Sequence, residues 1–207
     1  ACVAAGLKTK VNAVLSESLF EEKNVISESS WEISAKKQAK ERLLNNCLDL
    51  LELSRNSSVD VRFIEMMPIG LGRAYTMTSG DDVLRRIRKE YPGIRADYRE
   101  HGNGPAVYYT IPGFKGSLGF ISAMHGKFCD QCNRIRMTST GQIKPCLCYS
   151  DSYDLRAVLR NPDLDETFKL IKMKEIIIKS ALAKPREHCF EHPEEISEMK
   201  KMAMIGG

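Results

Sequence analysis

Three cysteines in the middle of the chain have a spacing that suits metal binding. Cys129, Cys132 and Cys146 form a C-x2-C-x13-C pattern, with Arg134 and Arg136 inside it. Two thiolates separated by two residues can bind one ion or one cluster from a tight turn, and a third can return after a β-hairpin. The pattern therefore predicts a metal centre beside an anion site.

The residues between the cysteines predict that hairpin. Residues 135–139 alternate apolar and polar side chains, Thr140-Gly141 supplies a turn, and residues 142–146 lead back to the first cysteine pair. Arg134 and Arg136 stand two residues apart, so on an extended strand both guanidinium groups point to the same face. Such a pair of guanidinium groups suits a triphosphate.

The cysteines admit three interpretations. A disulfide framework is disfavoured because the seven cysteines are an odd number and we find no signal peptide. A structural zinc site is open, since Cys148 could complete four thiolates. An iron–sulfur cluster held by three thiolates is also open, and it would leave one iron without a protein ligand. Spacing alone does not decide between zinc and iron.

The surrounding sequence resembles the carboxy-terminal part of the GTP 3′,8-cyclase family, the radical S-adenosylmethionine enzymes that open molybdenum-cofactor biosynthesis. The likeness rests on four segments and a lesser one at residues 184–188. The four are residues 6–14 (GLKTKVNAV), 61–70 (VRFIEMMPIG), 132–136 (CNRIR) and 204–207 (MIGG). They occur in order along nearly the whole chain.

The resemblance implies roles for the central residues. It implies that Cys129, Cys132 and Cys146 hold an auxiliary [4Fe–4S] cluster whose open iron contacts the guanine of GTP. Arg134 and Arg136 would then hold the triphosphate. The alternative for the arginines is a solvated strand face.

Further site residues follow from the same resemblance. It implies that Arg62, Lys10 and Asn12 lie on strands facing the substrate cavity. Their alternative roles are a buried ion pair with Glu65 and a strand-end hydrogen bond.

The terminal residues Gly206 and Gly207 form the last part of the resemblance. It implies that this diglycine tail enters the active site, where the lack of a Cβ allows close approach to a reacting substrate. The alternative is an ordinary frayed terminus.

One family motif is missing from the sequence. Radical S-adenosylmethionine enzymes carry a C-x3-C-x2-C loop whose cluster cleaves the cofactor, and no such triplet occurs here. We therefore expect a fragment that lacks the early barrel and is inactive alone, with S-adenosylmethionine and a second [4Fe–4S] cluster only in the full-length enzyme. There the deoxyadenosyl radical would take hydrogen from the ribose 3′ carbon, which then attacks C8 of the guanine. The alternative is a non-catalytic zinc-ribbon or iron–sulfur binding module.

The expected fold is α/β, with a partial radical SAM (TIM-like) barrel over residues 1–70 and an α+β auxiliary-cluster domain over 71–207. Residues 59–66 alternate as a strand. Further strands are expected over residues 106–111 and 117–122. Apolar spacing and capping residues predict helices near residues 30–51, 81–91, 163–183 and 193–202.

Composition limits the partners. The 207 residues carry a net charge of +4, and their basic runs indicate solvated helix faces, with no nucleic-acid motif beside them. No apolar run reaches membrane-spanning length. Unpaired cysteines indicate a reducing cytoplasm. The expected partners are GTP and, downstream in the pathway, cyclic pyranopterin monophosphate synthase, and a homodimer is left open.

Overall fold

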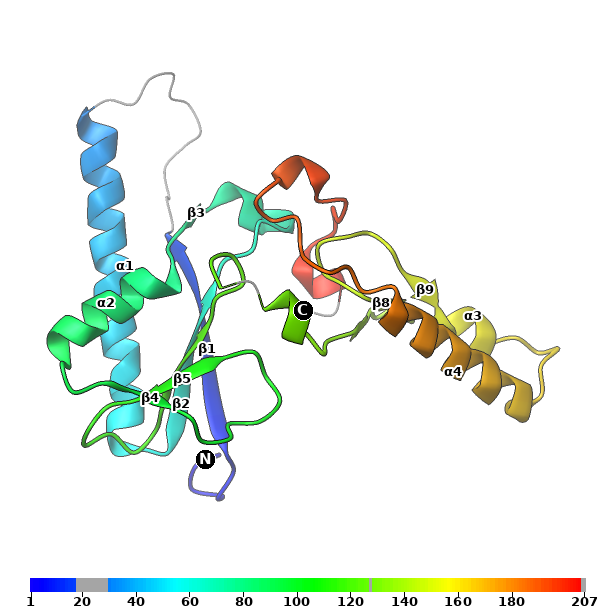
Figure 1. Ribbon diagram of the computed structural model, residues 1–207, viewed down its shortest axis with the longest axis horizontal. Helices are drawn as coiled ribbons and strands as arrows, with labels where there is room; N and C mark the ends of the chain where they lie inside the picture. Colours follow the sequence, from blue (N-terminus) through cyan, green and yellow to red (C-terminus); the bar gives the residue numbers. More distant parts are fainter. Residues whose placement is uncertain (18–29, 127, 206–207) are drawn as a thin grey trace. The chain divides into compact units, whose positions relative to one another are not determined.

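The computed structural model describes residues 1–17, 30–126 and 128–205. The chain forms two compact units, each with its own sheet (Figure 1). The first comprises Ala1–Met66 and Tyr75–Gly126, and the second comprises Met67–Ala74 and Lys127–Gly207.

A six-stranded mixed sheet forms the centre of the first unit. Its strands lie in the order β3 (Thr76–Met77), β1 (Thr9–Glu17), β2 (Val59–Glu65), β6 (Leu118–Ile121), β5 (Val107–Thr110), β4 (Arg95–Asp97). β1, β2 and β6 run parallel, and the remaining pairs are antiparallel. The α/β class is confirmed. The described strands form an open sheet and no closed barrel, so the partial barrel stays a prediction.

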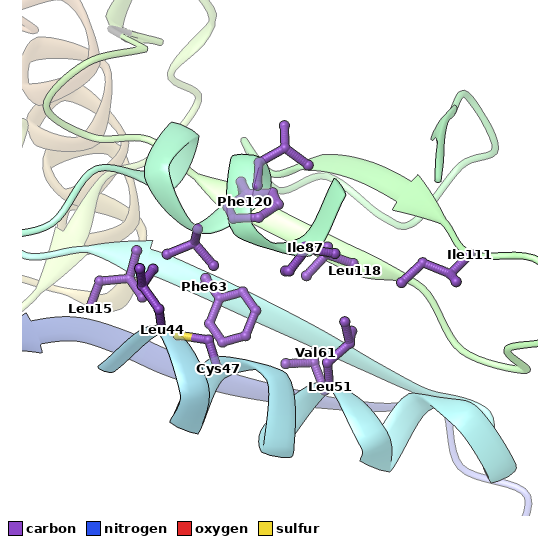
Figure 2. Packing of buried hydrophobic residues seen from close by; sticks show 12 residues of the cluster. Leu15, Leu44, Cys47, Leu51, Val61, Phe63, Ile87, Ile111, Leu118 and Phe120 are labelled. Atoms are coloured by element: carbon purple, nitrogen blue, oxygen red, sulfur yellow. The ribbon is translucent and has the colours of Figure 1, made fainter. Parts of the chain in front are cut away.

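The hydrophobic core of the first unit lies on one face of this sheet. In β2 the alternate residues Val59, Val61, Phe63 and Glu65 are buried, as the sequence alternation predicted. α1 (Ser30–Asn56) and α2 (Gly80–Glu90) pack on that face, and Figure 2 shows Phe63 among side chains from both helices. Burying one such side chain stabilises the fold by about 1.5–3 kcal/mol.

The predicted helix after residue 79 is confirmed as α2. The Ser79 side chain caps it by accepting a hydrogen bond from the Asp82 backbone N–H at 3.1 Å. Acidic residues occupy its first turn and Arg88 and Lys89 its last, which suits the helix dipole. No helix in the described part of the chain has the length and apolarity that crossing a bilayer requires.

The second unit is built around a small antiparallel sheet of β7 (Arg136–Met137), β8 (Gln142–Lys144) and β9 (Tyr153–Asp154). α3 (Leu155–Leu159) and α4 (Glu166–Leu182) follow it, and the second matches the helix predicted near 163–183. The unit also contains four short 3-10 turns: η1 (Gly70–Ala74), η2 (Cys129–Gln131), η3 (Pro193–Glu195) and η4 (Met202–Met204).

The helix predicted over residues 193–202 is wrong. Only η3 and η4 form there, because tertiary contacts take the groups that a helix would use. The Ile196 carbonyl accepts from Arg73 at 3.1 Å, and the Glu198 N–H donates to the Cys148 carbonyl at 3.3 Å. Glu198 buries its carboxylate 2.6 Å from Lys144 Nζ.

Candidate metal centre and the polar face of the first unit

The hairpin predicted between the cysteines is present. β7 and β8 pair with Arg136 opposite Lys144. The turn places Gly141 at φ 82°, a conformation in which glycine is favoured, and its N–H donates to the Thr138 carbonyl at 3.0 Å. The chain therefore returns toward the first cysteine pair as expected.

Cys129, Cys132 and Cys146, here called the cysteine centre, lie at the open end of this hairpin. Cys129 and Cys132 are held by the η2 turn, in which the Cys132 N–H donates to the Cys129 carbonyl at 3.2 Å. Burial raises the pKa of the Cys129 thiol, and the nearby Cys146 and Cys132 raise it further. The three thiols are therefore close enough to influence one another's charge, although each is only half-buried.

The two predicted phosphate-binding arginines lie in the same surroundings. Burial lowers the pKa of the half-buried Arg136, while Cys132 and Cys146 raise it and Arg134 lowers it. Arg136 thus lies near enough to two thiols and a second guanidinium to interact with their charges, and both arginines have further interactions within the protein. Like charges held together favour the binding of an anion between them.

The spacing of the sulfur atoms bears on which metal group fits. Thiolates around one zinc ion, each about 2.3 Å from it, lie roughly 3.8 Å apart in a tetrahedron. Among the described cysteines, no three sulfur atoms lie within 4.8 Å of one another. The assignment of the three cysteines to an iron–sulfur cluster stays a prediction.

Cys148 is directed into the protein. It is fully buried, and its sulfur accepts a hydrogen bond from the Cys189 backbone N–H at 3.3 Å. Burial strongly raises the pKa of the Cys148 thiol, and the Cys189 side chain raises it further. The exclusion of Cys148 from the ligand set stays a prediction.

Residues 184–188 contact the cysteine centre, a feature that the sequence reasoning missed. Lys184 Nζ lies 3.7 Å from Cys132 Sγ, and the nearby His188 backbone N–H opposes the rise in the pKa of the Cys129 thiol. His188 Nδ1 accepts from the Phe190 N–H at 3.3 Å, so Nε2 carries the hydrogen, yet Nε2 is buried with no partner among the described protein atoms. Such an orphaned donor fits a site whose bound group supplies an acceptor.

The three other predicted substrate residues share one face of the sheet in the first unit. Asn12 and Arg62 are opposite each other on β1 and β2, and Arg62 Nε donates to Asn12 Oδ1 at 2.7 Å. Lys10 stands two residues before Asn12, donates to the His101 carbonyl and lies 5.6 Å from the centre of the Tyr108 ring. The structure therefore brings all three together on the face opposite the hydrophobic core.

Glu65 is not the partner of Arg62, an alternative that the sequence left open. Its carboxylate lies on the core face and accepts hydrogen bonds from the backbone N–H groups of Gly80, Met124 and His125. His125 Nδ1 also forms a hydrogen bond with this carboxylate, 3.0 Å from Oε1.

The predicted site residues thus form two groups, one in each unit. The second unit contains the cysteine centre with Arg134 and Arg136. The first unit contains Lys10, Asn12 and Arg62. Gly206 and Gly207 lie outside the described residues. Ile205, which precedes them, is fully buried.

Comparisons with known proteins agree with the resemblance. A GTP 3′,8-cyclase of Clostridium perfringens (strain SM101 / Type A) is 41% identical over 160 residues, which cover 77% of this chain and 48% of the relative. One from Syntrophomonas wolfei is 37% identical over 163 residues, with the same coverage. The molybdenum cofactor biosynthesis protein 1 of Drosophila melanogaster is 37% identical over 155 residues, covering 70% of this chain and 26% of the relative.

The chain spans about half the length of the bacterial relatives it matches. Residues 59–190 match the family described as Molybdenum Cofactor Synthesis C, and they include β2, the cysteine centre and the Lys184 segment. The match extends over more than half of the sequence. The chain therefore belongs to the Molybdenum Cofactor Synthesis C family.

Proposed function

We propose that this chain is the substrate-binding part of a GTP 3′,8-cyclase. The full enzyme would convert GTP to (8S)-3′,8-cyclo-7,8-dihydroguanosine 5′-triphosphate in molybdopterin biosynthesis, and the similarity to GTP 3′,8-cyclases supports that activity. The observation that carries the proposal is the gathering of three thiols and Arg136 at the end of one hairpin.

Cys129, Cys132 and Cys146 are the proposed ligands of an auxiliary [4Fe–4S] cluster. When bound, the cluster supplies an iron without a protein ligand, which a nitrogen of the guanine can occupy. The similarity of the chain to GTP 3′,8-cyclases, together with the mutual electrostatic influence of the three thiols, supports this assignment over a single zinc ion. The three thiols would lose their protons on binding, as metal ligation requires.

Arg134 and Arg136 are the proposed triphosphate ligands. Guanidinium groups bind phosphate oxygens through paired, charge-assisted hydrogen bonds. Their mutual repulsion is relieved when a triphosphate lies between them. Triphosphate binding next to the cysteine centre, where the guanine is proposed to bind, would hold GTP at both ends.

Lys10, Asn12 and Arg62 are proposed to contact GTP in the full enzyme. Their shared sheet face offers a lysine ammonium, an amide and a guanidinium, which suit ribose hydroxyl and phosphate oxygens. Holding the nucleotide at several points fixes the ribose 3′ carbon near C8 of the guanine, which lowers the entropic part of the barrier.

The radical chemistry would need S-adenosylmethionine and a second [4Fe–4S] cluster. The sequence given contains no C-x3-C-x2-C ligand set for that cluster, so we propose that this chain alone does not turn over GTP. Gly206 and Gly207 would complete the active site of the full enzyme.

The test is anaerobic reconstitution of the chain with iron and sulfide, followed by GTP binding. We expect about four irons and four sulfides for each chain, as the proposed cluster requires, and a visible absorbance that GTP perturbs. Arg134→Met/Arg136→Met should abolish GTP binding while the iron and sulfide content stays unchanged. The control is Arg88→Met/Arg160→Met, a double change at exposed positions.

Two results would contradict the proposal. One zinc ion with no sulfide would identify a zinc-binding module. GTP affinity that survives the double change at Arg134 and Arg136 would show that the triphosphate binds elsewhere.

A further inference from the structure

Lys184 joins the two arms of the cysteine hairpin. Its ammonium lies 2.6 Å from the Arg134 carbonyl oxygen and 3.1 Å from the Pro145 carbonyl oxygen. Arg134 follows Cys132 by two residues, and Pro145 directly precedes Cys146. One side chain therefore binds the backbone next to two of the three cysteines.

The third neighbour of the ammonium is a thiol. Cys132 Sγ lies 3.7 Å from Lys184 Nζ, within the range of a hydrogen bond to sulfur. A lysine ammonium has three N–H donors, and here each has an acceptor. Two carbonyls fix the position of the charge, and the remaining donor is directed at the sulfur.

The position of Lys184 in the chain explains how it reaches the centre. It follows the end of α4, and four residues later the His188 backbone N–H lies near enough to Cys129 to lower the pKa of that thiol. The segment from 184 to 188 therefore contacts Cys132 through Lys184 and influences the charge of Cys129 through His188. A charge-assisted hydrogen bond to a thiolate is stronger than a neutral one.

We propose that Lys184 is a positioning residue for the cysteine centre. Its ammonium fixes both arms of the hairpin and stabilises negative charge on Cys132, so it controls how firmly the bound group is retained and at what potential that group is reduced. Partners outside the ligand shell commonly act in this way. The inference rests on the proposed function, because it concerns the group that the three cysteines hold.

The experiment compares four forms of the full chain after anaerobic reconstitution: wild type, Lys184→Met, Lys184→Arg and Lys174→Met. Lys174 is an exposed lysine on α4 and serves as the matched control. The readouts are iron and sulfide content, the rate at which a chelator removes iron, and the midpoint potential. Circular dichroism of each reconstituted form reports whether it is folded.

We expect Lys184→Met to lose iron about tenfold faster than wild type. Its midpoint potential should become more negative, since a nearby positive charge stabilises the reduced form. Lys184→Arg should recover part of both properties because it keeps the charge. Lys174→Met should behave as wild type.

If Lys184→Met does not fold, the same measurements are made on Lys184→Gln. This variant keeps N–H donors for the carbonyls but removes the charge. A folded Lys184→Gln variant with a lowered potential supports the proposal. A wild-type potential and loss rate in a folded, loaded Lys184→Met or Lys184→Gln variant would overturn it. Failure of the wild-type chain to take up iron and sulfide would instead overturn the proposed function.

Discussion

Glu65 offers the sharpest test of how the first unit is held together. Its side chain is 2% exposed, at the carboxyl end of β2. Oε1 accepts from the Gly80 N–H at 2.8 Å and contacts His125 Nδ1 at 3.0 Å. Oε2 accepts from the backbone N–H groups of Met124 at 2.8 Å and His125 at 3.1 Å. One carboxylate therefore ties the start of α2 to the loop that follows β6.

The perturbation is Glu65→Gln, which keeps the shape but removes the charge and one acceptor. The amide nitrogen is best placed toward His125 Nδ1, which can change tautomer and accept from it. The Gly80 N–H is then left buried without an acceptor, at a cost of about 1–3 kcal/mol. The two remaining bonds become neutral and weaken, adding about 1 kcal/mol. The expected loss of stability is thus about 2–4 kcal/mol.

This difference should depend on pH. Burial alone would raise the pKa of Glu65, but the hydrogen bonds from Gly80, His125 and Met124 together hold it below its ordinary value. The contribution of the carboxylate is therefore fully present above the unfolded pKa of about 4.3, and it is lost as the pH falls through the folded value. Wild type and Glu65→Gln should converge in acid.

The assay is urea unfolding followed by circular dichroism at neutral pH and at steps down to about pH 3. Glu41→Gln, an exposed change on α1, is the control and should stay within about 0.5 kcal/mol of wild type. A difference below about 0.5 kcal/mol for Glu65→Gln at neutral pH would refute the reasoning. So would a difference that does not shrink as the carboxylate is protonated.

Three further predictions concern packing and thiol chemistry. Lys144 and Glu198 form a buried ion pair, so Lys144→Met should cost about 3–5 kcal/mol in urea unfolding. Adding Glu198→Leu should recover most of that loss, and a double variant no better than the single one would contradict this account. A Cβ at Gly116 would overlap a backbone carbonyl oxygen of β2. Gly116→Ala should therefore lower the free energy of unfolding by at least about 1–3 kcal/mol. A urea midpoint equal to that of wild type would refute the clash. Burial raises the pKa of Cys47 to about 12, whereas Cys2 is exposed. Alkylation of the folded protein followed by mass spectrometry should therefore find Cys2 modified before Cys47. Equal alkylation rates for the two cysteines would contradict the burial of Cys47.

The elements that the sequence predicted well are those encoded by neighbouring residues. The Ser79 cap and the acidic first turn of α2 lie within four residues of one another, and the structure has both. The cysteine hairpin is equally local, since its turn needs only Gly141 and the alternation on either side. Local preferences such as these do not depend on tertiary contacts.

The segment over residues 193–202 marks the limit of that reasoning. Its composition suits a helix, but a helix there would move Glu198 away from Lys144 and the Ile196 carbonyl away from Arg73. A buried carboxylate that loses its lysine costs several kcal/mol, whereas intrinsic helix preferences differ by less than about 1 kcal/mol for each residue. The tertiary contacts therefore decide the conformation.

The same limit applies to the cysteine centre, where the local pattern predicts the ligands but not what surrounds them. Lys184 is 52 residues from Cys132 in sequence, and no spacing rule links a lysine after a helix to a thiol in a hairpin. The metal-binding pattern requires only that the sulfurs converge, so it carries no information on the charge beside them. The surrounding charge and hydrogen bonds set the potential and stability of a bound group. Two chains with identical cysteine spacing can therefore differ in the chemistry they support, and in this chain that difference is expected to depend on Lys184.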